Sequence, residues 1–181
     1  MERTFELKPF GTQLWTRPRA RKVRDHVNQL LEQLQPGDVL IIDLNGVEVF
    51  DTSFASEFFG KTQLSLSVDY PDRFLVIDHL TEYTEENLAD ALTKLNLIMV
   101  ARADGTLRLI GQVHPADAET FGAIQQAGSA VTSTELAQQL GLRLTAVNER
   151  LAKLANLGIL RRSDGVSPAG RLQYLYNLPT R

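Results

Sequence analysis

The stretch "VLIIDLNGVEVFDTSFASEFFG", residues 39–60, combines the patterns that decide the fold of the first part of the chain. Its opening is a continuous apolar run, which is typical of a strand covered on both faces. Residues 51–53 are all of types that cap helices. Four apolar residues then have the spacing of one helix face: Phe54, Ala55, Phe58 and Phe59. The stretch therefore predicts a buried strand, a polar turn and a helix.

The segments on both sides repeat this alternation of strand and helix. Upstream, "TFELKPF" predicts a short strand, and a helix is expected from Pro18 to the residues before Pro36. Downstream, "RFLVID" predicts a second buried strand, and Thr84 is placed to cap the helix that follows.

A hairpin closes this first part. "LIMVARADGTLRLIG", residues 97–111, predicts two strands joined at Asp104 and Gly105, a dipeptide that favours hairpin turns. The order βαβαβαββ predicts an α/β fold with a mixed sheet.

Composition limits the classes of function. The 181 residues include no cysteine, which excludes disulfides, thiolate metal sites and a cysteine nucleophile. The three histidines have no metal-ligand spacing, so we expect neither a metal nor a cofactor. No apolar run approaches the length of a membrane span, and the first ten residues lack the apolar region of a signal peptide. A cytoplasmic protein with no membrane partner is expected.

A change of charge divides the chain in two. Residues 1–115 carry 12 Lys or Arg against 17 Asp or Glu, a net charge of −5. Residues 116–181 carry 7 against 5, a net charge of +2. The junction is expected within "GQVHPADAE", which predicts domains at 1–112 and 113–181.

The second domain shows three helix patterns followed by two strands. The first helix is expected from about Ala116 to Ala127, and Thr132 with Glu135 fits the capping box of the second. The third carries one apolar stripe: Leu144, Val147, Leu151 and Leu154. "ILRRS" and "RLQYLYN" are then expected to pair across the loop "DGVSPAG".

The sequence "TSTELAQQLGLRLTAVNERLAKLANLGILRR" resembles the winged helix-turn-helix of bacterial regulators. The resemblance implies that the third helix enters the major groove of double-stranded DNA and that the wing contacts the backbone. The residues that this implies as DNA contacts are Arg143, Thr145, Asn148, Arg150, Lys153, Arg161, Arg162 and Arg171. Glu149 departs from the pattern, since relatives often carry a basic or small polar residue at this position. A carboxylate near phosphates weakens binding. The alternative is a winged helix that contacts proteins.

The first domain resembles the STAS-like domains of unknown function and, more distantly, STAS anti-sigma factor antagonists. The pattern that carries the resemblance is D-x-S-F-A-x-E-x-x-G: Asp51, Ser53, Phe54, Ala55, Glu57 and Gly60. In the antagonists a partner kinase phosphorylates a hydroxyl of this turn, and Ser53 falls on that position. Phe54 stands where the antagonists usually have glycine.

The resemblance thus implies a tip that accepts a phosphate or binds a protein, such as a kinase or an anti-sigma-like factor. The tip comprises Asp51, Thr52, Ser53 and Glu57. The alternative is that Asp51 or Ser53 only caps the helix.

Two further clusters compete with this interpretation. Asp43 and Asp78 each end a buried strand, with Asp51 and His79 close in sequence, and ligands collect at such strand ends. Strand-ending aspartates more commonly start turns, and no phosphate loop accompanies them, so an enzyme is not expected. The cluster "RPRARKVRDH" places cations at a helix start, where the dipole disfavours them, and indicates either a contact or a solvated face.

We therefore predict a non-enzymatic, two-domain transcriptional regulator, in which a STAS-like sensor or adaptor domain controls a winged-helix domain that binds double-stranded DNA. The alternative is an adaptor in which both domains bind proteins. Homodimer formation is left open.

Overall fold

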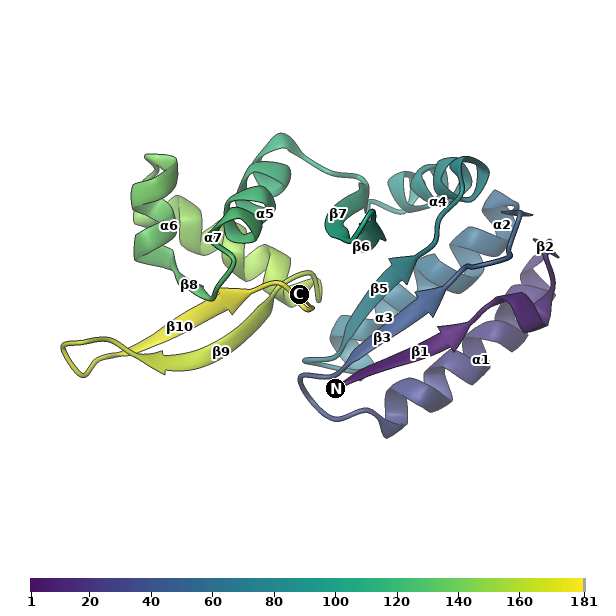
Figure 1. Ribbon diagram of the computed structural model, residues 1–181, viewed down its shortest axis with the longest axis horizontal. Helices are drawn as coiled ribbons and strands as arrows, with labels where there is room; N and C mark the ends of the chain where they lie inside the picture. Colours follow the sequence, from purple (N-terminus) through teal and green to yellow (C-terminus); the bar gives the residue numbers. More distant parts are fainter. Residues whose placement is uncertain (181) are drawn as a thin grey trace. The chain divides into compact units, whose positions relative to one another are not determined.

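The computed structural model describes residues 1–180, and its chain separates into two compact units, Met1–Val113 (unit 1) and His114–Arg181 (unit 2). In Figure 1, unit 1 runs from purple to teal and unit 2 from green to yellow. Within residues 1–180, no helix is both long enough and apolar enough to cross a membrane.

Unit 1 is built on a five-stranded sheet in the order β1-β3-β5-β6-β7. The strands are β1 (Glu2–Glu6), β3 (Val39–Asp43), β5 (Phe74–Asp78), β6 (Ile98–Ala103) and β7 (Thr106–Gly111). Neighbours are parallel except β6 and β7, which are antiparallel. The predicted mixed α/β sheet and the hairpin at Asp104 and Gly105 are both confirmed.

Helices connect the parallel strands. They are α1 (Arg17–Gln33), α2 (Thr52–Ala55), α3 (Lys61–Asp69) and α4 (Glu82–Lys94). Between α2 and α3 the chain makes a π-helical turn, η2 (Ser56–Gly60), which the sequence pattern did not reveal. A 3₁₀ turn, η1 (Lys8–Phe10), and a short parallel pair, β2 (Gln13–Leu14) with β4 (Val49–Phe50), were also missed.

The predicted cap of α4, Thr84, is wrong. Thr81 is the N-cap, and its hydroxyl accepts a hydrogen bond from the Thr84 amide at 3.2 Å. The Thr84 hydroxyl accepts one from the Thr81 amide at 2.8 Å. Thr84 therefore completes a capping box from inside the first turn, where it is fully buried.

The helices of unit 1 share one core with one face of the sheet. Leu40 and Ile42 of β3 and Leu75 and Ile77 of β5 lie in this core with the inner faces of α1, α2, α3 and α4. The next residues along the strands alternate to the opposite face, which is also apolar: Val39, Ile41, Phe74 and Val76. The strands are thus apolar on both faces, as their continuous apolar runs predict.

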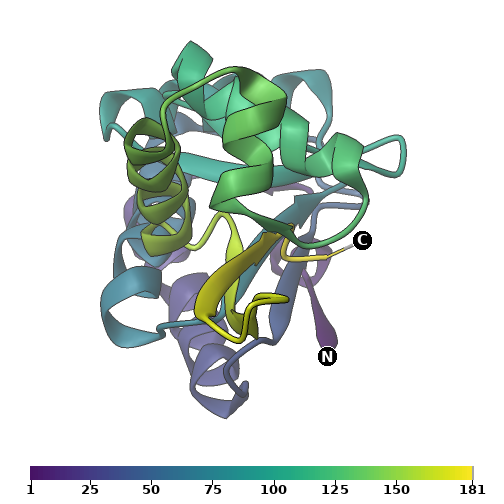
Figure 2. The same cartoon turned by 90° about the vertical axis from the view of Figure 1, so that its left-hand side faces the viewer.

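Unit 2 combines three helices with a three-stranded antiparallel sheet. Its elements are α5 (Pro115–Ala127), β8 (Val131–Thr132), α6 (Ser133–Leu140), α7 (Leu144–Asn156), β9 (Arg161–Val166) and β10 (Leu172–Asn177). The strand order is β8-β10-β9. Figure 2 shows the yellow strands beside the green helices of this unit. The capping box at Thr132 and Glu135 is confirmed.

Two local predictions in unit 2 are wrong. Leu144, assigned to the apolar stripe of α7, is 46% exposed, because it is the first residue of the helix and lies before the turn that packs. The strand pairing also extends into the predicted loop, as far as Val166 opposite Leu172. The turn itself is formed at residues 167–171, where the amide of Ser167 donates to the carbonyl of Arg171 at 2.8 Å.

Candidate functional site

Asp51 starts the helix that follows β4. Its Oδ1 accepts a hydrogen bond from the amide of Phe54 at 2.7 Å, and its backbone is extended, as an N-cap requires. The side chains of Thr52 and Ser53 are half-buried and make no hydrogen bond with any described residue. Of the two caps that the sequence left open, the structure therefore selects Asp51, and the Ser53 hydroxyl is left unengaged at the helix start.

Glu57, which was predicted as part of the tip, is buried. Its side chain is only 2% exposed, so its carboxylate is not available to a partner. It is held instead by three cations: Arg21 Nε at 3.2 Å, Arg24 Nη1 at 2.9 Å and Lys61 Nζ at 2.7 Å. Arg24 also donates to the Glu57 carbonyl at 3.1 Å. The accessible part of the tip is therefore residues 51–53.

These contacts account for part of the basic cluster at the start of α1. Arg21 and Arg24 lie one turn apart on this helix and reach across to η2. The guanidinium of Arg19 donates to the carbonyl of Phe10. Arg19, Arg21 and Arg24, which are unfavourably placed relative to the helix dipole, thus have specific acceptors. Sequence periodicity does not reveal the pairing of Arg21 and Arg24, because Glu57 lies 36 and 33 positions away.

The electrostatics of Glu57 follow from these contacts. Burial raises the pKa of its carboxyl, but hydrogen bonds from Lys61 and Arg21 and the charge of Arg24 outweigh burial, so the pKa lies below its ordinary value. Three cations on one carboxylate leave two positive charges in excess. Glu57 itself lies in the π-helical turn, a feature found often at functional sites.

Gly60 closes this π-helical turn. A Cβ at this position would collide with the side chain of Leu95 at the end of α4. The glycine of the D-x-S-F-A-x-E-x-x-G pattern is thus explained by close packing.

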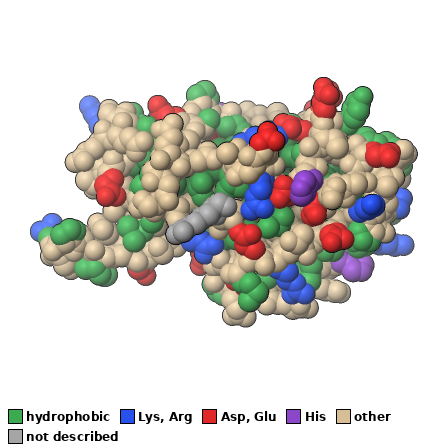
Figure 3. Space-filling model, in the orientation of Figure 1, with side chains coloured by type: hydrophobic (Ala, Val, Ile, Leu, Met, Phe, Trp, Pro, Cys, Tyr) green, Lys and Arg blue, Asp and Glu red, His purple; other side chains and the backbone are tan. Residues whose placement is uncertain are grey.

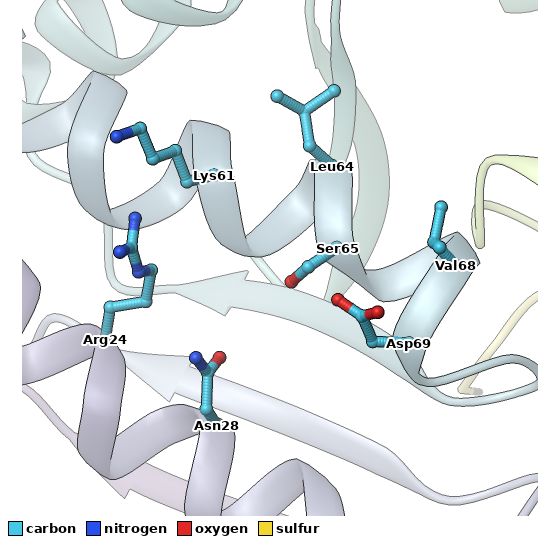
Figure 4. A pocket seen from close by; sticks show the side chains of 7 residues that line it. All are labelled: Arg24, Asn28, Lys61, Leu64, Ser65, Val68 and Asp69. Carbon is cyan, nitrogen blue, oxygen red and sulfur yellow. The ribbon is translucent and has the colours of Figure 1, made fainter.

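A groove lies between α1 and α3 beside this cluster (Figure 4). It has a volume of about 570 Å³. The lining residues are Arg24, Asn28, Lys61, Leu64, Ser65, Val68 and Asp69. Sequence reasoning missed this groove, because helix periodicity places Asn28 and Asp69 on outer faces without showing that the two helices are neighbours.

A second polar cluster lies at the carboxyl ends of β3 and β5. His79 Nδ1 is 2.7 Å from Asp43 Oδ1, and Arg102 Nη1 is 3.0 Å from Asp78 Oδ2. The structure therefore brings together Asp43, Asp78 and His79 but not Asp51, which caps α2. Asp43 and Asp78 also accept hydrogen bonds from the amides that follow them, at Asn45 and His79, as residues that start turns do. Within residues 1–180, no group of three His, Asp or Glu side chains is placed to hold a metal ion.

In unit 2, a smaller groove of about 220 Å³ lies between the start of α6, the exposed side of α7 and β10. Its lining residues are Thr132, Ser133, Thr134, Leu144, Asn148, Gln173 and Tyr174. Among the predicted DNA contacts, Asn148 lines this groove, and Arg143 and Thr145 are exposed at the start of α7. The hydroxyls at the start of α6 were missed as candidates, although the capping box already placed them at a helix N-terminus.

Two predicted contacts on α7 are engaged elsewhere. Lys153 Nζ lies 2.7 and 3.0 Å from the two carboxylate oxygens of Asp117, whose side chain is 3% exposed. Arg150 Nη1 lies 2.6 Å from Glu119 Oε2. Both cations therefore tie α7 to α5, so the structure pairs these two predicted DNA contacts with carboxylates of the neighbouring helix. Sequence periodicity placed them off the apolar stripe, but this side of α7 faces a neighbouring helix.

The predicted DNA contacts on the hairpin of β9 and β10 also differ from one another. Arg161 donates to the Pro179 carbonyl at 2.8 Å, and the guanidinium of Arg162 lies over the ring of Tyr174, 4.8 Å from its centroid. Arg171 is exposed at the turn. Three apolar side chains are exposed on the same hairpin: Val166, Leu172 and Tyr174. Figure 3 shows hydrophobic and basic side chains together at the end of this hairpin.

Comparison with known proteins identifies a part of unit 1. No curated protein matches the chain. Residues 19–85, from α1 into α4, match the model of a family described as a STAS-like domain of unknown function (DUF4325). The matched region includes Asp51, Ser53, Glu57 and all three cations that hold Glu57. The match supports a STAS-like interpretation of this part of unit 1.

Proposed function

We propose that the chain is a non-enzymatic transcriptional regulator, in which unit 2 is a winged helix-turn-helix domain that binds double-stranded DNA and unit 1 controls it. The observation that supports DNA binding best is the groove of unit 2, where hydroxyls at the start of α6 and the amide of Asn148 converge. Helix N-termini and hydroxyls bind phosphate oxygens, and asparagine reads adenine.

The element order of unit 2 supports the same proposal. Two helices, α6 and α7, are joined by a tight turn at Gly141, which has a left-handed φ of 65°, and are followed by a β-hairpin. This is the arrangement in which a second helix enters the major groove. Arg143, at the start of α7, and Arg162 and Arg171, on the hairpin, are exposed cations that suit backbone phosphates.

The test is binding to labelled duplex fragments at two salt concentrations, measured by fluorescence anisotropy. We expect affinity to fall log-linearly with salt, and a variant carrying Arg162→Ala and Arg171→Ala to lower the slope by about one per lost phosphate contact. Asn148→Ala should instead change sequence preference. Lys94→Ala is the control, because this lysine pairs with Asp90 on α4 of unit 1 and its loss should change neither quantity. Absence of duplex binding at low salt would exclude the proposal.

A second function, a protein-interaction adaptor, is favoured by one observation. Leu172 is 86% exposed and Val166 is 65% exposed, and they pair across the hairpin. Phosphates gain nothing from such side chains, whereas a protein surface buries them. In this case Leu172→Ser should abolish a protein contact, and the duplex should not bind.

A further inference from the structure

The groove between α1 and α3 has one cationic end. Lys61 and Arg24 line this end, and Arg21 lies beside them on α1. Arg21 is 59% exposed and contacts Glu57 through Nε, so both terminal nitrogens of its guanidinium have no hydrogen bond to any residue from 1 to 180. Lys61 is 51% exposed. The excess of positive charge over Glu57 is thus presented to solvent.

An apolar ridge runs along the same groove. Leu64 and Val68 lie one turn apart on α3 and are 50% and 77% exposed. Figure 4 shows both directed away from α1, along the helix that begins with Lys61. Side chains at i and i+4 form one surface, so the ridge can pack against apolar residues of matching spacing on another helix.

The far end of the groove is polar and acidic. Asn28, Ser65 and Asp69 point into the space between the helices (Figure 4). The Asn28 Oδ1 atom is buried and accepts no hydrogen bond from any residue from 1 to 180. Because this oxygen is buried, the exposed carboxylate of Asp69 is the group of this end that a ligand meets.

We propose that this groove docks an amphipathic helix of a partner protein that carries carboxylates at one end. Its apolar residues cover Leu64 and Val68, and a carboxylate at one end pairs with Arg21 and Lys61. The charge pattern sets the orientation, since the cationic end of the groove attracts the acidic end of the helix and Asp69 repels it. This interaction is separate from DNA binding by unit 2.

Duplex DNA fits the groove less well. The cations are confined to one end, and Asp69 lies at the other, where a continuing phosphate backbone would meet a like charge. The exposed side chains of Leu64 and Val68 also have no counterpart on a phosphate backbone. An acidic amphipathic helix satisfies the cations and the ridge together.

The experiment selects ligands from a phage-displayed library of helical peptides on the full-length protein. We expect the enriched peptides to share apolar residues at i and i+4 and Glu or Asp toward one end. Selection on Val68→Asp protein should lose this consensus. Selection on Val166→Asp protein should keep it, because Val166 is similarly exposed, at 65%, but lies on the hairpin of unit 2. Enrichment of basic peptides, no enrichment, or the same consensus on Val68→Asp protein would overturn the proposal.

Binding of the consensus peptide to variants then tests the proposed pairing of its carboxylate with Lys61. We expect Val68→Asp to weaken its binding at least about tenfold, as the loss of one buried valine implies. Lys61→Met should weaken the acidic peptide severalfold and leave a Glu→Gln version of the peptide unchanged, since Arg21 and Arg24 still hold Glu57 and the fold. Equal loss for both peptides would contradict the pairing. Displacement of the peptide by duplex DNA from wild-type protein, but not from Lys61→Met protein, would assign the groove to nucleic acid instead.

Discussion

Glu57 shows how one buried side chain joins two elements of unit 1. It lies in the π-helical turn, and two of its three cationic partners come from α1. The cations are partly exposed, so water can solvate them if the carboxylate is lost. The buried carboxylate, by contrast, has no other partner within residues 1–180. The stability of this junction therefore depends on the charge of Glu57 more than on any one cation.

We predict that Glu57→Gln lowers the free energy of unfolding by about 1–3 kcal/mol, because three cations lose the negative charge with which they pair. The pKa of Glu57 is lowered in the folded state, so its contribution is present above the unfolded pKa of about 4.3 and is lost as pH falls through the folded pKa. Urea unfolding between pH 3 and pH 7 measures this, and the variant should show a flatter acid limb than the wild type. Parallel curves would contradict the assignment.

At the tip, the hydrogen bond of Asp51 indicates that Asp51, and not Ser53, caps the helix. Asp51→Ala should lower the free energy of unfolding by about 1 kcal/mol, because the amide of Phe54 loses its acceptor. Ser53→Ala should have a much smaller effect, since its hydroxyl makes no hydrogen bond with the described residues. Thermal unfolding of the two variants checks this, and an equal loss for both would mean that Ser53 shares the cap.

At the scale of elements, α5 and α7 are joined by two ion pairs of different burial. Lys153 should be the important one, since Asp117 is 3% exposed, whereas both Arg150 and Glu119 are accessible to solvent. Lys153→Ala should lower the free energy of unfolding by about 1–3 kcal/mol, and Arg150→Ala by at most about 1 kcal/mol.

Chemical unfolding of the full-length variants distinguishes these roles from DNA contacts. If Lys153→Ala changes duplex sequence preference while leaving stability intact, then its pairing with Asp117 is not its main role. A change in stability alone supports the structural assignment.

At the scale of the whole molecule, the two units are predicted to fold separately. Fragments 1–113 and 114–181 should each give a folded circular dichroism spectrum, with the smaller fragment marginally stable because small domains bury little surface. Unfolded spectra from both fragments would show that the units share one cooperative core.

The proposed control of unit 2 by unit 1 predicts coupling between the tip and DNA. Ser53→Asp adds a negative charge that a helix N-terminus accommodates, while Ser53→Ala removes the hydroxyl. Their duplex affinities should differ by about 1–3 kcal/mol, which is typical of allosteric coupling, and by more than their difference in stability. Identical affinities, together with no phosphate in the intact mass of protein from its native host, would contradict a switch at Ser53. Asp51 would then only cap the helix, and the signal would enter at another site.

Local patterns in the sequence determined the strands of the main sheet, most of the helices and their order. The apolar runs placed β3 and β5, Asp104 with Gly105 placed the hairpin, and Thr132 with Glu135 placed the start of α6. These features depend on residues within a few positions of one another, so short stretches of sequence are enough to predict them. The D-x-S-F-A-x-E-x-x-G pattern likewise located the STAS-like segment.

Only the tertiary structure decided which of those residues meet. Arg21 and Arg24 reach a carboxylate more than thirty positions away, and Lys153 reaches Asp117 across a similar separation. Periodicity tells which face of a helix is polar, but it does not tell whether that face meets water or another helix. For this reason the sequence assigned Glu57 to a partner-binding tip and Lys153 to the DNA contacts, while burial and ion pairing place both in contacts between helices.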